Sequence, residues 1–150
     1  MTNDEIYMRE AIAEAQIAAS LGEVPIGAVV VWDGEIVARA HNTRETEKTA
    51  LGHAECSAIA AACKALGGWR LHRATLYVTL EPCPMCAGAI VMAGVDAVYY
   101  GAADARAGCA GSVYALPEDP AFGKKIPCMG GMMAQRCTEI LDGFFEERRG

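Results

Sequence analysis

Two short stretches contain the side chains of this sequence that could together do chemistry: His53-Ala54-Glu55 and Pro82-Cys83-Pro84-Met85-Cys86. They supply an imidazole, two thiols and a carboxylate. Imidazole and thiolate are preferred ligands of Zn²⁺; a catalytic zinc site keeps three protein ligands and leaves the fourth position to water, whereas a structural site is closed by four. His53, Cys83 and Cys86 therefore predict an open site that holds about one Zn²⁺ per chain.

Glu55 lies two positions after the histidine and has no ligand role in this scheme. A carboxylate beside a metal-bound water can take its proton and later deliver it to a substrate. We therefore predict that Glu55 is the catalytic proton carrier.

Other interpretations account for parts of this pattern. A single histidine or cysteine is usually a core or surface residue, a Cys-x-x-Cys pair can be redox-active, and the same pair with a histidine can hold structural zinc. The combined spacing is far more specific than either half, which favours the catalytic site. A non-catalytic zinc module would need neither the carboxylate at Glu55 nor an open coordination position.

The sequence around the ligands predicts two helices that would position them. An alanine-rich helix over 54–66 would start directly after His53, and a helix over 83–92 would carry Cys83 and Cys86 in its first turn. Pro84 suits a first helical position. The positive end of a helix dipole favours thiolate over thiol, so both cysteines would be held in the metal-binding form.

The remaining pattern predicts an α/β protein. Strands are expected at 26–32, 35–40, 74–80 and 95–100, and the hairpin signal Asp33-Gly34 joins the first two. Two outer helices are expected at 2–21 and 132–149. Strand, helix and strand in succession from 74 to 100 imply a parallel crossover. We expect one domain, residues 1–150, with three α/β/α layers and a mixed sheet of about five strands.

Composition limits the possible classes of protein. With 150 residues, 53% hydrophobic and 21% charged, the chain has the profile of an ordinary globular domain. No apolar run reaches the ~20 residues that cross a bilayer, and the N-terminus lacks a basic leader. We therefore expect a cytoplasmic location and no membrane partner. The cysteine count of 7 is odd, and we expect those outside the metal set to be unpaired, namely Cys56, Cys63, Cys109, Cys128 and Cys137.

The two chemical stretches resemble the zinc-dependent nucleobase and nucleoside deaminases, which share a His-x-Glu and a Pro-Cys-x-x-Cys signature. Within this family the likeness is greatest to the bacterial tRNA adenosine deaminases. It extends over nearly the whole chain and is carried by Glu23-Val24-Pro25-Ile26-Gly27-Ala28-Val29, His41-Asn42, the run from Leu76 to Ala89, and Gly101-Ala102-Ala103-Asp104 leading to Gly108.

The resemblance implies a cytidine-deaminase-like fold, a nucleobase-containing substrate and, commonly for the family, a homodimer. It also implies substrate contacts through Asn42, through backbone groups around Ala54 and Glu81, and through Asp104. Asn42 could instead be an ordinary turn residue, and Asp104 a solvated loop carboxylate.

Which base is deaminated stays open between the tRNA anticodon loop and a free base or nucleoside such as guanine, cytosine or cytidine. Three stretches depart from the tRNA enzymes' pattern: Leu51-Gly52, 122–127 and Glu146-Glu147. The net charge of -6 also opposes binding to phosphates, which depends on Lys and Arg. If the substrate is RNA, basic residues must gather at the mouth of the site, and the candidates are Arg44, Lys48, Arg106, Lys124, Lys125, Arg148 and Arg149.

Overall fold

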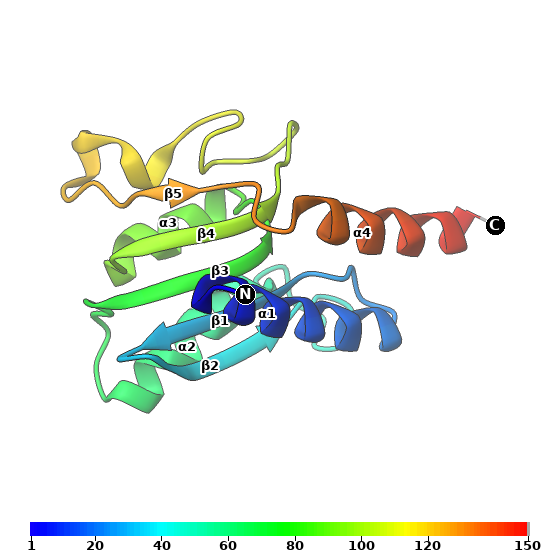
Figure 1. The fold of residues 1–150 in the computed structure, drawn as a ribbon, viewed down its shortest axis with the longest axis horizontal. Coiled ribbons are helices and arrows are strands. Elements are labelled where there is room, and N and C mark those ends of the chain that lie inside the picture. The colour runs from blue at the N-terminus through cyan, green and yellow to red at the C-terminus, as the bar shows by residue number, and fades with distance from the viewer. Residues whose placement is uncertain (150) are drawn as a thin grey trace.

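The computed structural model describes residues 1–149 and shows a five-stranded sheet covered by helices on both faces (Figure 1). Its elements in chain order are α1 (Asn3–Ser20), β1 (Gly27–Trp32), β2 (Glu35–His41), α2 (Ala54–Leu66), β3 (Ala74–Leu80), α3 (Pro84–Ala93), β4 (Ala97–Ala102), the 3-10 turns η1 (Leu116–Glu118) and η2 (Pro120–Phe122), β5 (Cys128–Met129) and α4 (Ala134–Arg149).

The strand order is β2-β1-β3-β4-β5, and the sheet is mixed as the sequence predicted. β1 pairs antiparallel with β2 and β3, whereas β3–β4 and β4–β5 are parallel. The β1–β2 hairpin turns at Asp33 (φ 52°) and Gly34 (φ 77°). Two successive positive φ values define the turn that Asp-Gly favours, and they match the twist of the flanking strands.

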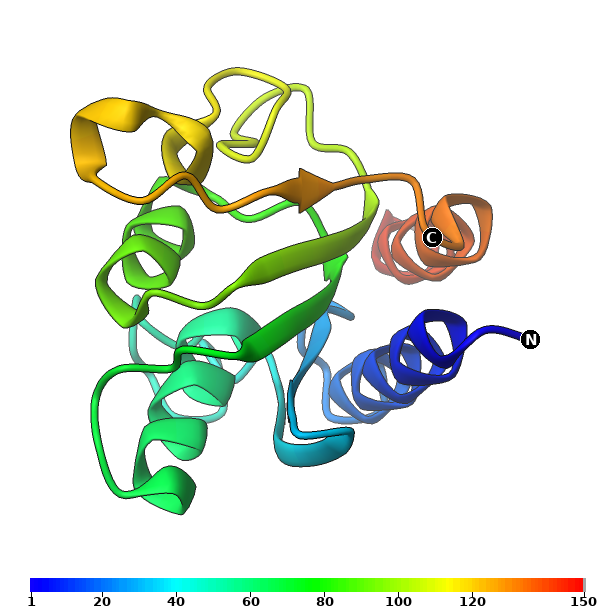
Figure 2. The ribbon, with the colours of Figure 1, turned by 60° about the vertical axis from the view of Figure 1, so that its left-hand side comes forward.

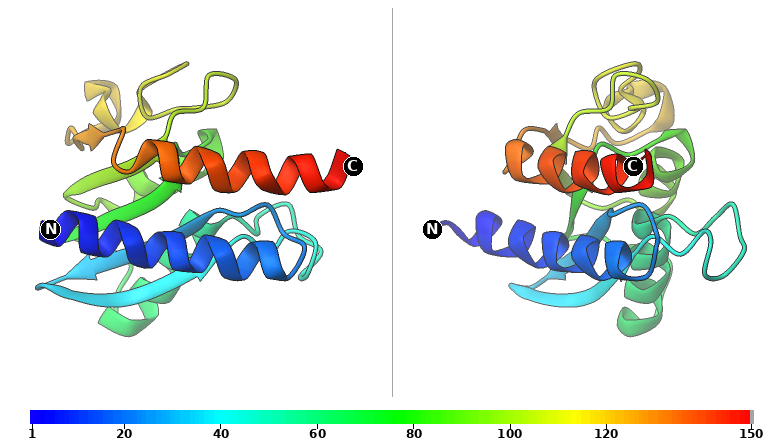
Figure 3. Two further views of the ribbon diagram at one scale, coloured as in Figure 1. Left: turned by 45° about the vertical axis from the view of Figure 1, so that its right-hand side comes forward. Right: turned by 90° about the vertical axis from the view of Figure 1, so that its right-hand side faces the viewer.

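Alternate residues of β1 contribute to two separate cores. Ala28 and Val30 face α2 and α3, and Val29 and Val31 face α1. This alternation follows from the two-residue period of a strand buried on both sides. Figure 2 shows the sheet between the two helix layers, and Figure 3 shows α1 and α4 side by side on one face. The predicted three-layer α/β/α architecture is confirmed.

Most predicted boundaries agree with the structure, and two differences stand out. The helix at 54–66 and the strand at 74–80 are confirmed, while β4 begins at Ala97, two residues later than expected. The fifth strand, β5, has only two residues and no sequence signal of its own; it forms because β4 offers it a parallel edge. Of the helices within residues 1–149, none combines the length and apolar character that crossing a membrane requires.

Candidate metal centre and proton carrier

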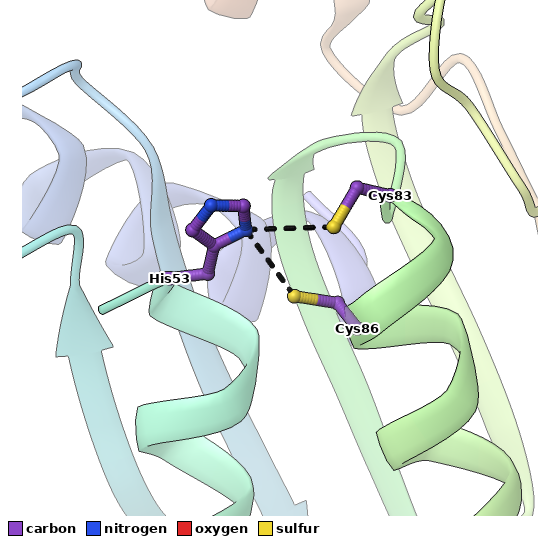
Figure 4. Close-up of side chains that lie close together, drawn as sticks. All are labelled: His53, Cys83 and Cys86. Atoms are coloured by element: carbon purple, nitrogen blue, oxygen red, sulfur yellow. Dashed lines mark hydrogen bonds between the residues drawn. The ribbon is translucent and has the colours of Figure 1, made fainter. Parts of the chain in front are cut away.

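The first turns of α2 and α3 lie next to each other and carry the predicted ligands (Figure 4). His53 is the N-cap residue of α2, and Cys83 is the N-cap residue of α3. Pro84 is the first residue of α3, where its missing N–H costs no helical hydrogen bond. Two helix N-termini therefore direct their positive dipole ends toward one place, which favours thiolates there.

The side chains of His53, Cys83 and Cys86 converge as the sequence predicted. The Nδ1 atom of His53 lies 3.5 Å from the Sγ atom of each cysteine, and the three ligand atoms all lie within 4.8 Å of one another. Tetrahedral zinc with bonds of about 2.3 Å to sulfur and about 2.0 Å to nitrogen would separate these atoms by about 3.5 Å. The donor set and its spacing therefore fit Zn²⁺.

The thiols are also prepared for metal binding. Hydrogen bonds with Cys86 and with His53 lower the pKa of the Cys83 thiol to about 4, against the effect of its partial burial. The pKa of the Cys86 thiol is raised, first by its contact with Cys56 and then by its contact with Cys83. Cys83 thus carries the charge of this pair, and a divalent cation would favour ionisation of both sulfurs.

A third thiol lies beside the centre without belonging to the convergent set. The Sγ atom of Cys56 is 3.6 Å from that of Cys86, and this contact lowers the pKa of Cys56 to about 7. The three-residue group that could hold a metal does not include Cys56. All seven cysteines are free, in agreement with the expectation for those outside the metal set.

Glu55 is the second residue of α2, and only 4% of its surface is exposed. Burial disfavours the charged carboxylate and raises its pKa to about 7. A carboxyl group with a pKa near neutrality can both accept and return a proton at physiological pH. The carboxyl group of Glu55 thus has the properties of a proton carrier and lies in the first turn of α2, two residues after His53.

Asn42 follows β2 and is buried against the start of α2. Its Oδ1 atom accepts a hydrogen bond of 2.9 Å from the backbone N–H of Ala54. The backbone N–H of Ala54 is thereby engaged within the chain, and the amide nitrogen of Asn42 is the part of this pair that could meet a substrate. Asn42 also ties the end of β2 to the helix that carries His53.

Glu81 and Asp104 belong to one connected loop structure. The backbone N–H of Asp104 donates to Oε1 of Glu81 at 3.0 Å. Oδ1 of Asp104 accepts from the backbone N–H groups of Arg106 and Ala107, at 3.0 and 3.2 Å, and so closes a turn. Asp104 is half-buried rather than fully solvated. The side chain of Glu81 is committed to this loop, so only its backbone could contact a base.

Sequence reasoning missed the role of Glu23, which is 1% exposed although it lies outside any helix or strand. Its carboxylate accepts hydrogen bonds from Glu45 and Thr46 in the loop that leads to His53. Burial opposes ionisation, but these hydrogen bonds outweigh it and the pKa of Glu23 is lowered. The only available signal was an acidic residue four positions before a strongly apolar strand.

Four of the seven basic residues nominated for the mouth of the site have contacts that place them, and these four separate into two groups. Arg106, Arg148 and Arg149 line a groove of about 380 Å³ with Asp142 and Phe145. Lys124, in contrast, is wrongly placed by the prediction: its Nζ atom bonds to Gly94 O and Asp96, at the end of α3 that is opposite to Cys83. It therefore cannot contribute to a mouth at the first turn of α3.

The chain shows extended similarity to known proteins. Residues 2–149 match the family model described as MafB19-like deaminase. The tRNA-specific adenosine deaminase of Bacillus subtilis strain 168 is 54% identical over 149 residues, which are 99% of this chain and 92% of that protein.

Two solved structures extend the comparison. A structure from a study of A-to-I editing by tRNA:A34 deaminases at the wobble position superposes with a TM-score of 0.87 at 41% identity, over 91% of this chain and 99% of the other. A guanine deaminase from Bacillus subtilis gives a TM-score of 0.64 at 42% identity, over 66% of this chain and 64% of the other. At nearly equal identity, the first structure therefore superposes better and over more of both chains.

Proposed function

Because this chain belongs to the deaminase family that contains the tRNA-specific adenosine deaminases, we propose that it converts adenosine to inosine at the wobble position of tRNA. The observation that carries the substrate assignment is the 54% identity to the Bacillus subtilis enzyme over 99% of this chain. Its support in the site is the convergence of three metal-ligand atoms near a buried carboxyl group.

The proposal assigns a role to each residue of the centre. His53, Cys83 and Cys86 would hold one Zn²⁺, which when bound supplies Lewis-acid activation of water at neutral pH. Glu55 takes one proton from water and delivers it to the ring nitrogen. It then takes the second proton from the hydroxyl formed at the ring carbon and delivers it to the amino group, which leaves as ammonia while the ring carbon keeps the oxygen. Asn42, held by its bond to Ala54, would orient the base.

A groove between α4 and the ends of β3 and β4 would receive the RNA strand. It has a volume of about 360 Å³ and is lined by the loop 102–106 and by α4, including Asp104, Arg106, Leu141 and Phe145. It shares Arg106, Asp142 and Phe145 with the adjoining groove at Arg148 and Arg149. Guanidinium groups beside an aromatic ring suit a single strand, because phosphates pair with the cations and bases stack on the ring.

Salt dependence tests the tRNA assignment. We expect turnover of an anticodon stem-loop under subsaturating conditions to fall steeply with salt, since about three phosphate contacts give a log–log slope of roughly -2. Arg106→Ala should reduce the magnitude of this slope by about 0.7, the share of one contact. Lys124→Ala is the matched control: it removes a cation at the opposite end of α3 and should leave the slope unchanged.

The second candidate function is deamination of a free base such as guanine. Its support is the partial likeness to the guanine deaminase. A free base has no phosphate, so its turnover should be nearly independent of salt. Ammonia release would be measured from the stem-loop, guanine, cytosine, cytidine and adenosine in parallel. Turnover of a free base without turnover of the stem-loop would refute the tRNA assignment and leave the metal chemistry intact.

The proposal includes a cytoplasmic homodimer. A reducing compartment keeps the ligand thiols free, and all seven cysteines are free in the structure. The outer face of α2 and α3 is apolar and grooved, with Met92 at 74% and Trp69 at 62% exposure, and it is lined by Ile59, Ala89 and Ala93. A second apolar groove, formed by Val91, Leu116 and Phe122, also includes Met92. Apolar surface of this kind suits a protein interface.

Met92→Glu should therefore convert the dimer to a monomer, because the new charge would be buried without a partner. Sedimentation velocity measures this change. Ile6→Glu on α1 is the control, since it adds the same charge to an exposed apolar residue on the other face of the sheet. A wild-type protein that sediments as a monomer would refute the dimer.

A further inference from the structure

Two glutamates at the edges of the metal centre are almost fully buried, and neither belongs to the ligand set. Glu23 and Glu81 are each 1% exposed. Glu23 precedes β1, and Glu81 directly follows β3, two residues before Cys83. A buried carboxylate is costly unless hydrogen bonds compensate it, so the partners of these two side chains indicate what they do.

Glu81 receives four hydrogen bonds from a single loop. Its Oε1 atom accepts from the N–H of Asp104 at 3.0 Å and from the hydroxyl of Ser112. Its Oε2 atom accepts from the N–H groups of Ala110 and Ser112, at 3.0 and 2.9 Å. The loop has little regular structure, so the carboxylate satisfies N–H groups that no strand or helix pairs.

The loop is also shaped around this carboxylate. A Cβ atom at Gly108 would lie 2.3–2.4 Å from the carboxyl group of Glu81, so only glycine fits at that position. The N–H of Cys109 donates to the carbonyl of Pro82 at 2.8 Å, which joins the same loop to the segment just before Cys83. The loop and the ligand segment are therefore held together at adjacent points.

Glu23 makes an equivalent arrangement with the loop that leads to His53. Its carboxylate accepts from the N–H of Glu45 at 3.2 Å, and from the N–H and hydroxyl of Thr46. This loop is closed by a 2.9 Å hydrogen bond from the N–H of Thr43 to the carbonyl of Gly52, the residue before His53. Each irregular segment beside the metal ligands is thus fastened by one buried carboxylate.

From these contacts we propose that Glu81 is a positioning residue that fixes the loop 104–112 as one wall of the substrate groove, and that Glu23 is its counterpart for the loop 43–52. The inference rests on the proposed function, because it makes Asp104 and Arg106 parts of the groove. Glu81 acts through the loop that presents them.

Glu81→Gln tests this role. Both carboxylate oxygens accept backbone N–H groups, so an amide placed either way turns its NH₂ group toward at least one donor. We expect the KM for the stem-loop to rise about tenfold or more through loss of charge-assisted hydrogen bonds, while kcat changes by less than about threefold. Zinc content should stay at one per chain, because the ligands are held by α2 and α3.

Amide hydrogen exchange reports the loop directly and needs no substrate. Glu81→Gln should accelerate exchange at Asp104, Ala110 and Ser112 and leave Thr46 unchanged, whereas Glu23→Gln should do the reverse. Ser112→Ala removes one hydroxyl donor and should give a smaller effect of the same kind. Glu118→Gln is the matched control, since its carboxylate accepts one N–H, from Cys128 of β5, and no hydrogen bond from the loop 104–112 is found for it.

These readouts separate the inference from the proposed function. If the wild-type protein deaminates a free base instead, the exchange pattern is still expected and the KM comparison is made with that base. If Glu81→Gln does not fold, Ser112→Ala carries the test. Unchanged exchange at the three amides, or faster exchange with an unchanged KM, would overturn the positioning role.

Discussion

Replacing Glu55 with glutamine should reduce deamination by about 10²- to 10⁴-fold, because an amide cannot carry the proton that a general acid–base group transfers. The side chain keeps its size and its place in the first turn of α2. Zinc content should remain at one per chain, since the three ligand atoms are untouched. Burial already raises the pKa of this carboxyl to about 7, so the fold does not depend on its charge, and the thermal midpoint should not fall.

The measurement is turnover on the substrate identified from the panel, with zinc determined by elemental analysis on the same samples. Glu35→Gln provides the control, because Glu35 is an exposed carboxylate at the start of β2 and belongs to neither loop beside the metal ligands. Its loss changes the local charge without removing a proton carrier, and turnover should stay near normal. Near-normal turnover in Glu55→Gln would show that another group moves the proton.

The convergence of His53, Cys83 and Cys86 could be predicted from the sequence because its signals are local. A His-x-Glu and a Cys-x-x-Cys fix which side chains share one helical turn, and glycines after each segment fix where the helices end. What the sequence could not supply is how distant segments meet. The roles of Glu23 and Glu81 depend on loops more than 20 residues away along the chain, and no short sequence pattern predicts such a contact.

Two further differences have the same origin. The two-residue strand β5 exists only because β4 presents an open edge, and its own residues carry no periodic signal. Lys124 was nominated by charge alone, but its position is set by the path of the chain through η1 and η2, which places it beside Asp96. Residues whose neighbours are set by tertiary structure were therefore the ones that sequence reasoning placed least well.

A second large effect is expected when a metal ligand is removed. Cys86→Ser should lose zinc and, with it, deamination, because a serine hydroxyl stays protonated at neutral pH and is a poor ligand for Zn²⁺. The fold should persist, since α2 and α3 still pack on the large apolar core that they share with β1 and β3. Circular dichroism would verify this, and elemental analysis would give the zinc content.

The neighbouring Cys56 makes a single substitution insufficient. Its Sγ atom lies 3.6 Å from that of Cys86, close enough to replace the lost ligand after a small movement. The double variant Cys56→Ser, Cys86→Ser should therefore be free of zinc even where the single variant retains part of it. Cys56→Ser alone should keep one zinc per chain, because Cys56 lies outside the convergent set, and Cys63→Ser controls for the loss of an α2 thiol farther from the centre. Full zinc occupancy in the double variant would show that Cys86 is dispensable. Loss of zinc in Cys56→Ser would show that Cys56 is a ligand. Either result would refute the three-ligand site.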